Sequence, residues 1–457
     1  MMKALRFTIP EIRAAYAAGA RVGDVVLEAV RRADSYPHGG VWITRIPSEA
    51  LRARVKGLDG LDAPARANMP LYGMPCAIKD NMDLAGYPTT AACPAYAYTP
   101  AQTAFAVRRL EAAGAVIIGK TNMDQFATGT AGLRSPYGQP RSVFGRDYVA
   151  GGSSSGSAVA VAAGIVPFAL GSDTAGSGRI PAAFNNIVGL KPSRGIISAA
   201  GVVPCNRTLD CVSVLAHSAE DTMIVLDALA EMDPADAYSR ARPPAPEVGG
   251  RAFTFAVPRA ADLEFFGNAE YARMFAEAVA AMERAGGSKI EIDLAPFRDA
   301  GALLYGAGFI AERVADLGEF IEKHQDACHP NVVKLILGNK DRTGAEVFKG
   351  LHKLEALKRD VAGVFSRADF LLVPTSPLHK TAKEIEADPI ALPWKFSTYC
   401  GFANILDLSG FAVPAGLTRE GLPFGVQLVG PTFAEAKLAP IAGRFMAAVG
   451  SFTGAPG

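Results

Sequence analysis

The chain has 457 residues, of which 49% are hydrophobic, so it holds enough apolar side chains to bury a large core. Its 46 Lys and Arg residues nearly balance its 45 Asp and Glu residues, and the net charge is +1. A chain without a charge excess creates no global field that would steer it onto nucleic acid or a membrane, so we expect neither as a partner.

The N-terminal segment, residues 1–19, has Leu, Ile and Tyr at positions that suit a short amphipathic helix. It lacks the apolar core and the cleavage site of a secretory signal peptide. The longest apolar stretch, residues 158–170, is interrupted by Gly164 and Pro167 and is shorter than the roughly 20 residues that span a bilayer. We therefore expect a cytoplasmic protein without a transmembrane helix.

Six cysteines and six histidines are spread along the chain without a CxxC pair or an HExxH motif. Zinc sites and disulfide frameworks need these residue types at short, regular spacings. We therefore expect buried free thiols, as in a reducing compartment, and no metal or other cofactor.

Helical and strand patterns alternate along the chain. Residues 103–115 and 268–287 have helical periodicity closed by Gly, and each is followed by a short apolar run that is typical of a strand. Further buried strands are predicted at residues 251–258 and 369–377, and residues 410–430 are predicted to form an antiparallel hairpin. These elements indicate an α/β fold, a large mixed β-sheet flanked by helices.

Two loops rich in Gly and Ser, residues 151–157 and 171–179, flank an Ala/Val-rich helix and a short apolar run. A single loop of this kind is more often a flexible turn or an anion-binding nest than a catalytic element. In the second loop, however, small residues leave the backbone free to approach a ligand, so successive N–H groups can converge on one oxygen as an oxyanion hole requires. The donors predicted here are those of Thr174, Ala175, Gly176 and Ser177.

Lys79 follows the apolar run at residues 74–78, where a strand would carry it inward. Neither Gly/Ser loop contains a histidine, so Ser–His–Asp chemistry has no support in the sequence. An isolated lysine is ordinarily solvated, but burial favours the neutral amine, which can accept a proton. Lys79 is therefore the candidate base for a serine nucleophile.

The motifs GMPCAIKDN, GGSSSGSA and DTAGSGRIPAAFNNIVGLKPSRG together resemble the amidase signature family. The resemblance implies a Ser–cis-Ser–Lys triad, in which Ser177 is the nucleophile, Ser153 the bridging serine on a cis peptide bond and Lys79 the base. It also implies cleavage of an amide C–N bond through an acyl-enzyme, with a carboxylate and an amine or ammonia as products.

The substrate must be inferred from residues outside these motifs. Tyr305 and Arg313 are eight residues apart, about 80° around a single helix, so both are predicted to face one pocket with Phe309 between them. Taken alone, Arg313 would be a solvated residue paired with Glu312 or Asp316. The stretch that contains these residues, together with GKTNMDQFATGTAGLRSPYG and EADPIALPWKFSTYCGFANILDLSGFAVPAG, resembles allophanate hydrolases.

This second resemblance implies a small anionic amide as the substrate. Arg313 would contact the carboxylate of allophanate, Tyr305 would orient its ureido group, and Gly129 would offer backbone contact on the opposite wall. The chain departs from that group at Gly308 and Phe309, where Pro and Trp are usual. The open alternatives are a general amidase, a carboxybiuret-type hydrolase, the glutamine-hydrolysing A subunit of a tRNA-dependent amidotransferase, and a catalytically silent interaction protein.

Residues 231–250 are rich in Pro, Ala and charged side chains, which is typical of a surface crossover. The N-terminal half, about residues 1–230, carries the triad, and the C-terminal half, about residues 251–457, completes the sheet and the substrate pocket. We expect residues 1–457 to form a single amidase domain with no additional C-terminal domain, and the protein to be a homodimer.

Three further residues draw attention because of their position. Lys191 is expected to stabilise the turn after the nucleophile loop, and His217 to lie near a helix start that Ser218 caps. Arg179 either pairs with Asp173 or touches the substrate, and the sequence leaves these two alternatives open.

Overall fold

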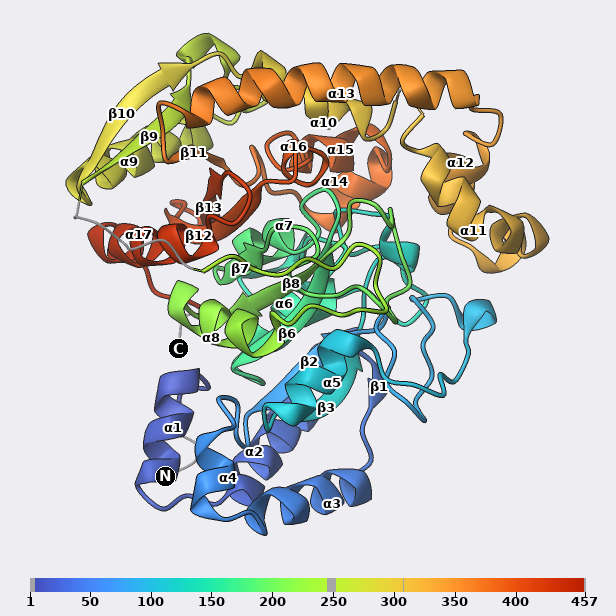
Figure 1. The fold of residues 1–457 in the computed structure, drawn as a ribbon, viewed down its shortest axis with the longest axis vertical. Helices are drawn as coiled ribbons and strands as arrows, with labels where there is room; N and C mark the ends of the chain where they lie inside the picture. The colour runs from blue at the N-terminus through green and yellow to red at the C-terminus, as the bar shows by residue number, and fades with distance from the viewer. Residues whose placement is uncertain (1–4, 245–251, 307, 456–457) are drawn as a thin grey trace.

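The computed structural model describes residues 5–244, 252–306 and 308–455, and its centre is an 11-stranded mixed β-sheet (Figure 1). The strand order is β1-β3-β2-β6-β8-β7-β12-β13-β11-β9-β10. In chain order, these strands are β1 (Trp42–Arg45), β2 (Pro75–Lys79), β3 (Val116–Thr121), β6 (Phe168–Asp173), β7 (Val188–Lys191), β8 (Cys211–Ala216), β9 (Phe253–Pro258), β10 (Gly287–Ile292), β11 (Phe370–Pro374), β12 (Ser409–Leu417) and β13 (Pro423–Gly430). Strands β4 (Arg141–Ser142) and β5 (Gly145–Val149) form a separate pair.

The order of the strands divides the sheet along the chain. Strands β1, β2, β3, β6, β7 and β8 form one side and β9 to β13 the other, and the two sides meet where β7 pairs antiparallel with β12. Strand β2 lies between β3 and β6 and runs parallel to both. Parallel strands place their carboxyl ends at the same edge of a sheet, so the ends of β2 and β6, at Lys79 and Asp173, lie near each other.

Helices cover the sheet and close its ends (Figure 1). They are α1 (Ile9–Ala17), α2 (Val22–Ser35), α3 (Ser48–Asp59), α4 (Ala63–Ala67), α5 (Phe105–Ala112), α6 (Ser155–Ala162), α7 (Arg179–Phe184), α8 (Ala219–Leu229), α9 (Ala269–Arg284), α10 (Ala295–Leu303), α11 (Ala311–Lys323), α12 (Pro330–Leu337), α13 (Gly344–Phe365), α14 (Ala382–Ala387), α15 (Ala391–Phe396), α16 (Phe402–Ile405) and α17 (Glu435–Ala448). In Figure 1, α1 to α4 lie at the bottom, α13 crosses the top, and α11 and α12 project at the right.

The predicted alternation of helices and strands is confirmed. Helix α5 leads into β3, α9 leads into β10, and the predicted strands at residues 251–258 and 369–377 are β9 and β11. Strands β12 and β13 pair antiparallel as a hairpin. The N-terminal helix α1 follows Thr8, whose side chain accepts a hydrogen bond from the Glu11 N–H and so caps the helix.

The prediction of one continuous helix carrying Tyr305 and Arg313 is wrong. Helix α10 ends at Leu303 and α11 begins at Ala311, so Tyr305 lies in the connection between two helices. The physical reason lies at Gly308, whose φ of +90° is a left-handed conformation that glycine adopts most readily. A Cβ atom at Gly308 would also come within 2.6 Å of the backbone of α13, so the chain turns where this helix packs against it.

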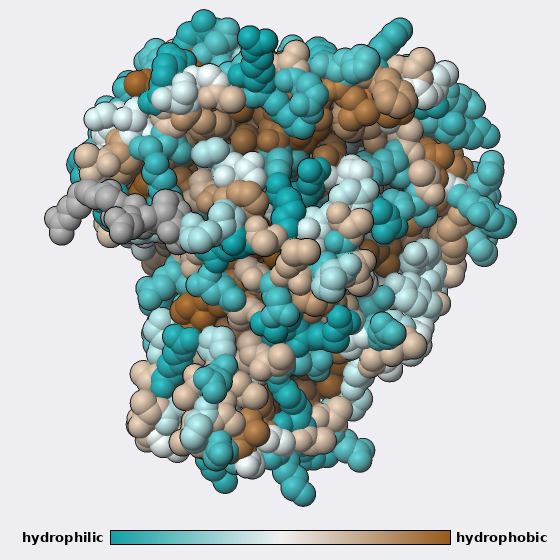
Figure 2. Space-filling view, in the orientation of Figure 1, coloured by the Kyte–Doolittle hydropathy of each residue, from teal (hydrophilic) through white to brown (hydrophobic). Residues whose placement is uncertain are grey.

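The predicted crossover and the cysteines can also be located in the structure. Residues 231–244 form neither helix nor strand and are mostly exposed, as predicted for the start of the crossover, and residues 245–250 lie outside the described part of the chain. All six cysteines are buried and free, as predicted. No helix among the described residues is long and apolar enough to cross a membrane. The face in Figure 2 is mainly hydrophilic, with small apolar patches scattered over it.

Candidate active site

Lys79 ends strand β2 and lies fully buried beneath the two Gly/Ser loops. Hydrogen bonds join its Nζ to Ser153 Oγ at 2.7 Å and to Ser172 Oγ at 2.8 Å. Asn81 Nδ2 also donates to Ser172 Oγ at 3.3 Å. The structure thus brings the predicted base and the predicted bridging serine, 74 residues apart in the chain, into direct contact.

The environment of Lys79 makes its amine easier to deprotonate than that of a solvated lysine. Burial lowers the pKa of Lys79 from its ordinary value to about 8, although the charges of Asp124, Asp210 and Asp173 act in the opposite direction. A lysine with this pKa is partly neutral near pH 7 and can therefore accept a proton.

The first Gly/Ser loop is tied to its surroundings on both sides of Ser153. The peptide bond between Gly152 and Ser153 is cis, as the family resemblance implies. The Ser153 carbonyl accepts from the Asp124 N–H at 3.1 Å, and the Ser154 N–H donates to the Ser177 carbonyl at 3.1 Å. This last bond links the two Gly/Ser loops directly, so Ser153 and Ser177 are held in a common framework.

Asp173 organises the second loop through its carboxylate. This carboxylate accepts from the backbone N–H groups of Gly176 at 2.9 Å, Gly178 at 3.1 Å and Arg179 at 3.2 Å. The Gly176 N–H, predicted as an oxyanion donor, is therefore committed to Asp173 in this structure. Gly176 has a φ of +113°, and a Cβ there would meet the Cβ of Cys400 at 2.6 Å, so the glycine also allows this close packing.

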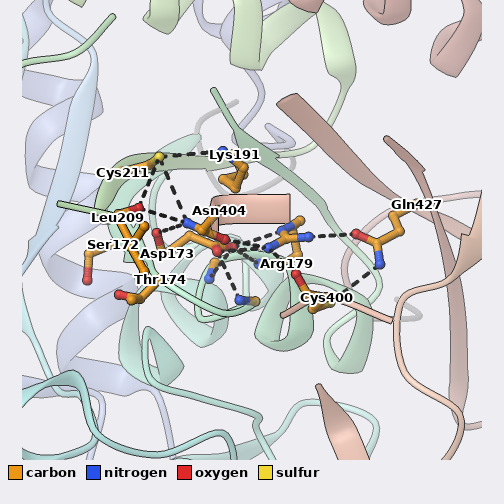
Figure 3. A network of polar contacts seen from close by, with 12 residues as sticks. Ser172, Asp173, Thr174, Arg179, Lys191, Leu209, Cys211, Cys400, Asn404 and Gln427 are labelled. Carbon is orange, nitrogen blue, oxygen red and sulfur yellow. Dashed lines mark hydrogen bonds and ion pairs between the residues drawn. The ribbon is translucent and has the colours of Figure 1, made fainter. Parts of the chain in front are cut away.

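Arg179 pairs with Asp173 in a buried network that joins the two sides of the sheet (Figure 3). Arg179 Nη2 lies 3.0 Å from Asp173 Oδ1, and both side chains are fully buried. Further guanidinium N–H groups donate to Gln427 Oε1, the Cys400 carbonyl and Asn404 Oδ1. Of the two alternatives left open by the sequence, the structure therefore has the ion pair with Asp173.

Opposing effects within this network determine the pKa of Asp173. Burial alone would raise the pKa of its carboxyl, but the charge and hydrogen bonds of Arg179, with the loop N–H groups, lower it to about 2. The carboxylate is therefore ionised at neutral pH, as its three backbone hydrogen bonds require.

Lys191 and His217 have the structural roles that the sequence predicted. Lys191 is buried and donates to the Pro192 carbonyl at 2.8 Å, in the turn after β7. His217 precedes helix α8, and Ser218 caps that helix by accepting from the Asp221 N–H at 2.9 Å.

A small cavity of about 40 Å³ opens beside Ser177, which is only 4% exposed. The residues that line it are Ala127, Thr128, Gly129, Thr130, Arg134, Thr174, Ala175, Ser177, Cys205, Tyr305, Arg313, Leu335, Pro393, Trp394 and Ser397. We call Thr174, Ala175 and Ser177 the catalytic wall, and Gly129, Arg134, Tyr305, Arg313 and Trp394 the recognition wall.

The recognition wall brings Tyr305 and Arg313 together although they lie on different elements. The Arg313 guanidinium lies over the Tyr305 ring, with its Cζ 5.6 Å from the ring centroid. The Tyr305 ring also lies 4.1 Å from the Trp394 ring, measured between centroids. The shared pocket that the sequence predicted therefore exists, but tertiary packing and not a single helix creates it.

Arg313 is 3% exposed, and no carboxylate oxygen of the described residues lies within 4.0 Å of its side-chain nitrogens. Its Nε donates to Asn206 Oδ1 at 2.7 Å. The two acidic neighbours considered as partners are engaged elsewhere, because Glu312 accepts from Thr208 and Asp316 pairs with Arg207. Arg313 is thus a buried cation with no carboxylate at salt-bridge distance in the described part of the chain, although the more distant charge of Asp210 helps to raise its pKa.

Sequence reasoning missed Asn206 and Asp210, which connect the two walls. Asp210 accepts from the Thr174 hydroxyl and, at 2.7 Å, from the Cys205 N–H, while the Asn206 N–H also donates to it. Burial raises the pKa of Asp210 to about 6, although these hydrogen bonds favour the ionised form. No motif marks Asn206, because its partner Arg313 is 107 positions away in the chain.

The described residues contain no group of three or more His, Cys, Asp or Glu side chains that could hold a metal ion. The polar groups around the cavity are instead serines, a lysine, arginines and a tyrosine. This set provides a nucleophile, a proton acceptor and cationic binding groups.

The sheet and the linked Gly/Ser loops define the class of protein. The family model described as Amidase matches residues 24–439, and the chain belongs to this amidase family. The particular relatives are informative. Urea amidolyase from Saccharomyces cerevisiae is 39% identical over 413 residues, which are 90% of this chain and 22% of that protein. The chain thus spans less than a quarter of the length of this relative.

Two other relatives match over most of their own length. The A subunit of glutamyl-tRNA(Gln) amidotransferase from Geobacillus kaustophilus is 34% identical over 459 residues, covering 93% of each chain. The solved structure of Kluyveromyces lactis allophanate hydrolase superimposes with a TM-score of 0.92 at 37% identity, covering 97% of this chain and 73% of that one. The chain is therefore similar both to an amidotransferase subunit and to an allophanate hydrolase.

Proposed function

We propose that this chain is an allophanate hydrolase, an amidohydrolase that cleaves a small anionic ureido substrate and releases ammonia. The observation that carries the proposal is the cavity beside Ser177, where Arg313 is buried without a carboxylate partner among the described residues. Burying an unpaired cation is unfavourable, so this cavity favours a ligand that supplies a negative charge. A planar guanidinium suits a carboxylate in particular.

In this proposal three residues of the recognition wall have a role. Arg313 binds the carboxylate of allophanate through the terminal nitrogens that Asn206 leaves free for a ligand. Tyr305 orients the ureido group, and Gly129 offers a backbone contact. The volume of about 40 Å³ is room for only a few water molecules, which favours a substrate as small as allophanate.

The proposed chemistry proceeds through an acyl-enzyme. Lys79 accepts a proton from Ser153 while Ser153 accepts one from Ser177, and Ser177 Oγ attacks the terminal carbonyl carbon. The relay returns the proton to the leaving nitrogen, so the C–N bond breaks and ammonia departs. Water then hydrolyses the ester by the same route. The balance is H₂N–CO–NH–COO⁻ plus H₂O giving ⁻OOC–NH–COO⁻ plus NH₄⁺.

The catalytic wall supplies the proposed oxyanion donors. The backbone N–H groups of Thr174, Ala175 and Ser177 belong to residues that line the cavity, whereas the Gly176 N–H is engaged by Asp173. We propose that the first three residues stabilise the tetrahedral oxyanion and that Gly176 shapes the loop.

The relatives support this substrate more than they support the alternatives. The chain matches an allophanate hydrolase and a urea amidolyase at 37% and 39% identity, compared with 34% for the amidotransferase. A general amidase would use the same triad but would not require Arg313. A carboxybiuret-type hydrolase would also bind a carboxylate, but its substrate is longer than allophanate and fits the small cavity less well. All three residues of the predicted triad are present, and Lys79 Nζ lies 2.7 Å from Ser153 Oγ, which argues against a catalytically silent protein.

The proposal is tested by ammonia release from allophanate, glutamine and a plain aliphatic amide. We expect turnover of allophanate, and we expect Arg313→Ala to raise its KM by about 10- to 100-fold, because a charge-assisted hydrogen bond is lost. Arg207→Ala is the matched control, since Arg207 is an exposed arginine paired with Asp316. Ammonia from glutamine or aliphatic amides but not from allophanate would overturn the substrate.

The cellular setting is part of the proposal. We propose a cytoplasmic, homodimeric enzyme that functions as a single amidase domain. We also propose that it has no nucleic-acid or membrane partner, which the balanced charge of the chain supports. Light scattering of the purified protein measures its mass, and a monomer at micromolar concentration would contradict the homodimer.

A further inference from the structure

The recognition wall contains a second arginine, Arg134, that the proposed roles above do not use. Its backbone N–H donates to Asp124 Oδ1 at 2.9 Å, and this hydrogen bond holds the backbone of Arg134 in place. Its guanidinium donates through Nη1 to the Thr128 carbonyl at 2.9 Å and through Nη2 to the Pro389 carbonyl at 3.2 Å. Both acceptors are neutral, so they orient the guanidinium without neutralising its charge.

Arg134 resembles Arg313 in having no side-chain ion pair among the described residues. No carboxylate oxygen of the described residues lies within 4.0 Å of the side-chain nitrogens of Arg134. Partial burial lowers the pKa of Arg134, the charge of Asp124 acts in the opposite direction, and the positive charge of Arg313 adds to the lowering. Two guanidinium groups therefore share one small cavity and repel each other when it holds no anion.

An anion between the two arginines would relieve both the repulsion and the cost of desolvation. The guanidinium of Arg134 has five N–H donors, of which the two carbonyls take two, so donors remain for a ligand. Arg313 likewise uses its Nε for Asn206. A carboxylate has about four lone-pair sites and can accept from two guanidinium groups at once.

We propose that Arg134 is a specificity-determining residue that binds the substrate carboxylate together with Arg313. This inference rests on the proposed function, because it names Arg134 as a second residue that binds the carboxylate of the same substrate. Arg134 then selects for a carboxylate over the isosteric carboxamide, and it acts on substrate affinity more than on the chemical step.

The test measures ligand binding in a Ser177→Ala parent, which cannot turn over the ligands. Allophanate is compared with biuret, which carries a carboxamide in place of the carboxylate, by titration calorimetry. We expect Arg134→Gln to weaken allophanate binding about tenfold and to change biuret binding by less than about twofold, because only the charged ligand loses an ionic contact. Arg134→Lys keeps the charge and should retain most of the allophanate affinity.

The controls separate this role from a structural one. Arg146→Gln, at an exposed arginine outside the cavity, should leave both affinities unchanged. Thermal unfolding of each variant shows whether loss of the two carbonyl contacts alters the fold. Equal weakening of both ligands by Arg134→Gln, or no change in either, would overturn the inference.

The inference and the proposed function can fail separately. If the wild type hydrolyses allophanate but Arg134→Gln binds it normally, only the role of Arg134 is overturned. If the wild type does not hydrolyse allophanate, the proposed function fails, and the same comparison is made with malonamate and malonamide. A preference for the carboxylate that disappears in Arg134→Gln would then support Arg134 as an anion-binding residue, and its persistence would overturn that role.

Discussion

The two walls of the cavity are built in different ways. The catalytic wall lies on the loop between β6 and α7, and behind it Lys79 and Ser153 are fully buried. The recognition wall is assembled from separate stretches, including the connection between α10 and α11 and the short helix α15, and its Trp394 is 45% exposed. The reacting groups are thus held by the central sheet, whereas the groups that select the substrate come from its periphery.

This difference predicts how each wall responds to mutation. A buried polar network is held by many hydrogen bonds at once, so removal of one member disturbs reacting groups that every amide substrate needs. A peripheral wall contacts only part of the substrate, so its loss should alter affinity for the anion and leave the chemical step largely intact. Four predictions, from the largest expected effect to the smallest, test this division.

The enzyme should lose nearly all activity when the nucleophile in the catalytic wall is removed. We expect Ser177→Ala to lower kcat by about 10⁵- to 10⁶-fold for every amide substrate, because the acyl-enzyme cannot form. Steady-state ammonia release measures the loss, with Ser366→Ala, at an exposed serine after α13, as the control. A Ser177→Ala variant that keeps a tenth of the activity would place the nucleophile elsewhere.

Removal of the base should have the next largest effect. We expect Lys79→Met to lower kcat by about 10³- to 10⁴-fold. Since the pKa of Lys79 is about 8, the neutral fraction in the wild type rises about tenfold per pH unit below that value, and kcat/KM should rise with pH and level off above about pH 8. Lys353→Met, at an exposed lysine of α13, should change neither quantity. A wild-type profile that is flat from pH 6 to 8 would exclude Lys79 as the base.

The ion pair behind the catalytic wall should matter for stability. Arg179→Met leaves Asp173 buried without its partner, and we expect a loss of about 3–5 kcal/mol in the free energy of unfolding. The double variant with Asp173→Asn should recover part of this loss, which urea unfolding measures. Because the pKa of Asp173 is lowered to about 2, its contribution is fully present above about pH 4 and is lost as the pH falls toward 2. A single variant as stable as the wild type would show that the network is dispensable.

The sequence predicted the catalytic wall better than the recognition wall. Local periodicity was enough for elements such as α5 with β3, and short motifs pointed to Lys79, Ser153 and Ser177 as a set that the resemblance linked. The turn at Gly308 was missed because helical spacing alone does not show that α13 packs against that position. Arg134 was missed because an isolated arginine gives no sign of whether a carboxylate will lie nearby in the fold.

The smallest effect is expected at Asn206, which holds the recognition wall against the catalytic wall. Its Oδ1 accepts from Arg313 Nε at 2.7 Å, and its Nδ2 donates to the Phe309 carbonyl and to Glu312. We expect Asn206→Ala to raise the KM for allophanate about tenfold, because Arg313 is no longer positioned, while kcat changes less than about threefold. Steady-state kinetics with allophanate and a neutral amide measures both constants, with Asn339→Ala as the control.

A second substitution distinguishes positioning from a general loss of structure. Asn206→Asp keeps an acceptor for Arg313 but adds a carboxylate that competes with the substrate for the guanidinium. We therefore expect Asn206→Asp to bind allophanate at least as weakly as Asn206→Ala, with affinity for a neutral amide unchanged. If kcat falls for every substrate in both variants, Asn206 supports the catalytic wall as well, and the division between the two walls does not hold at this residue.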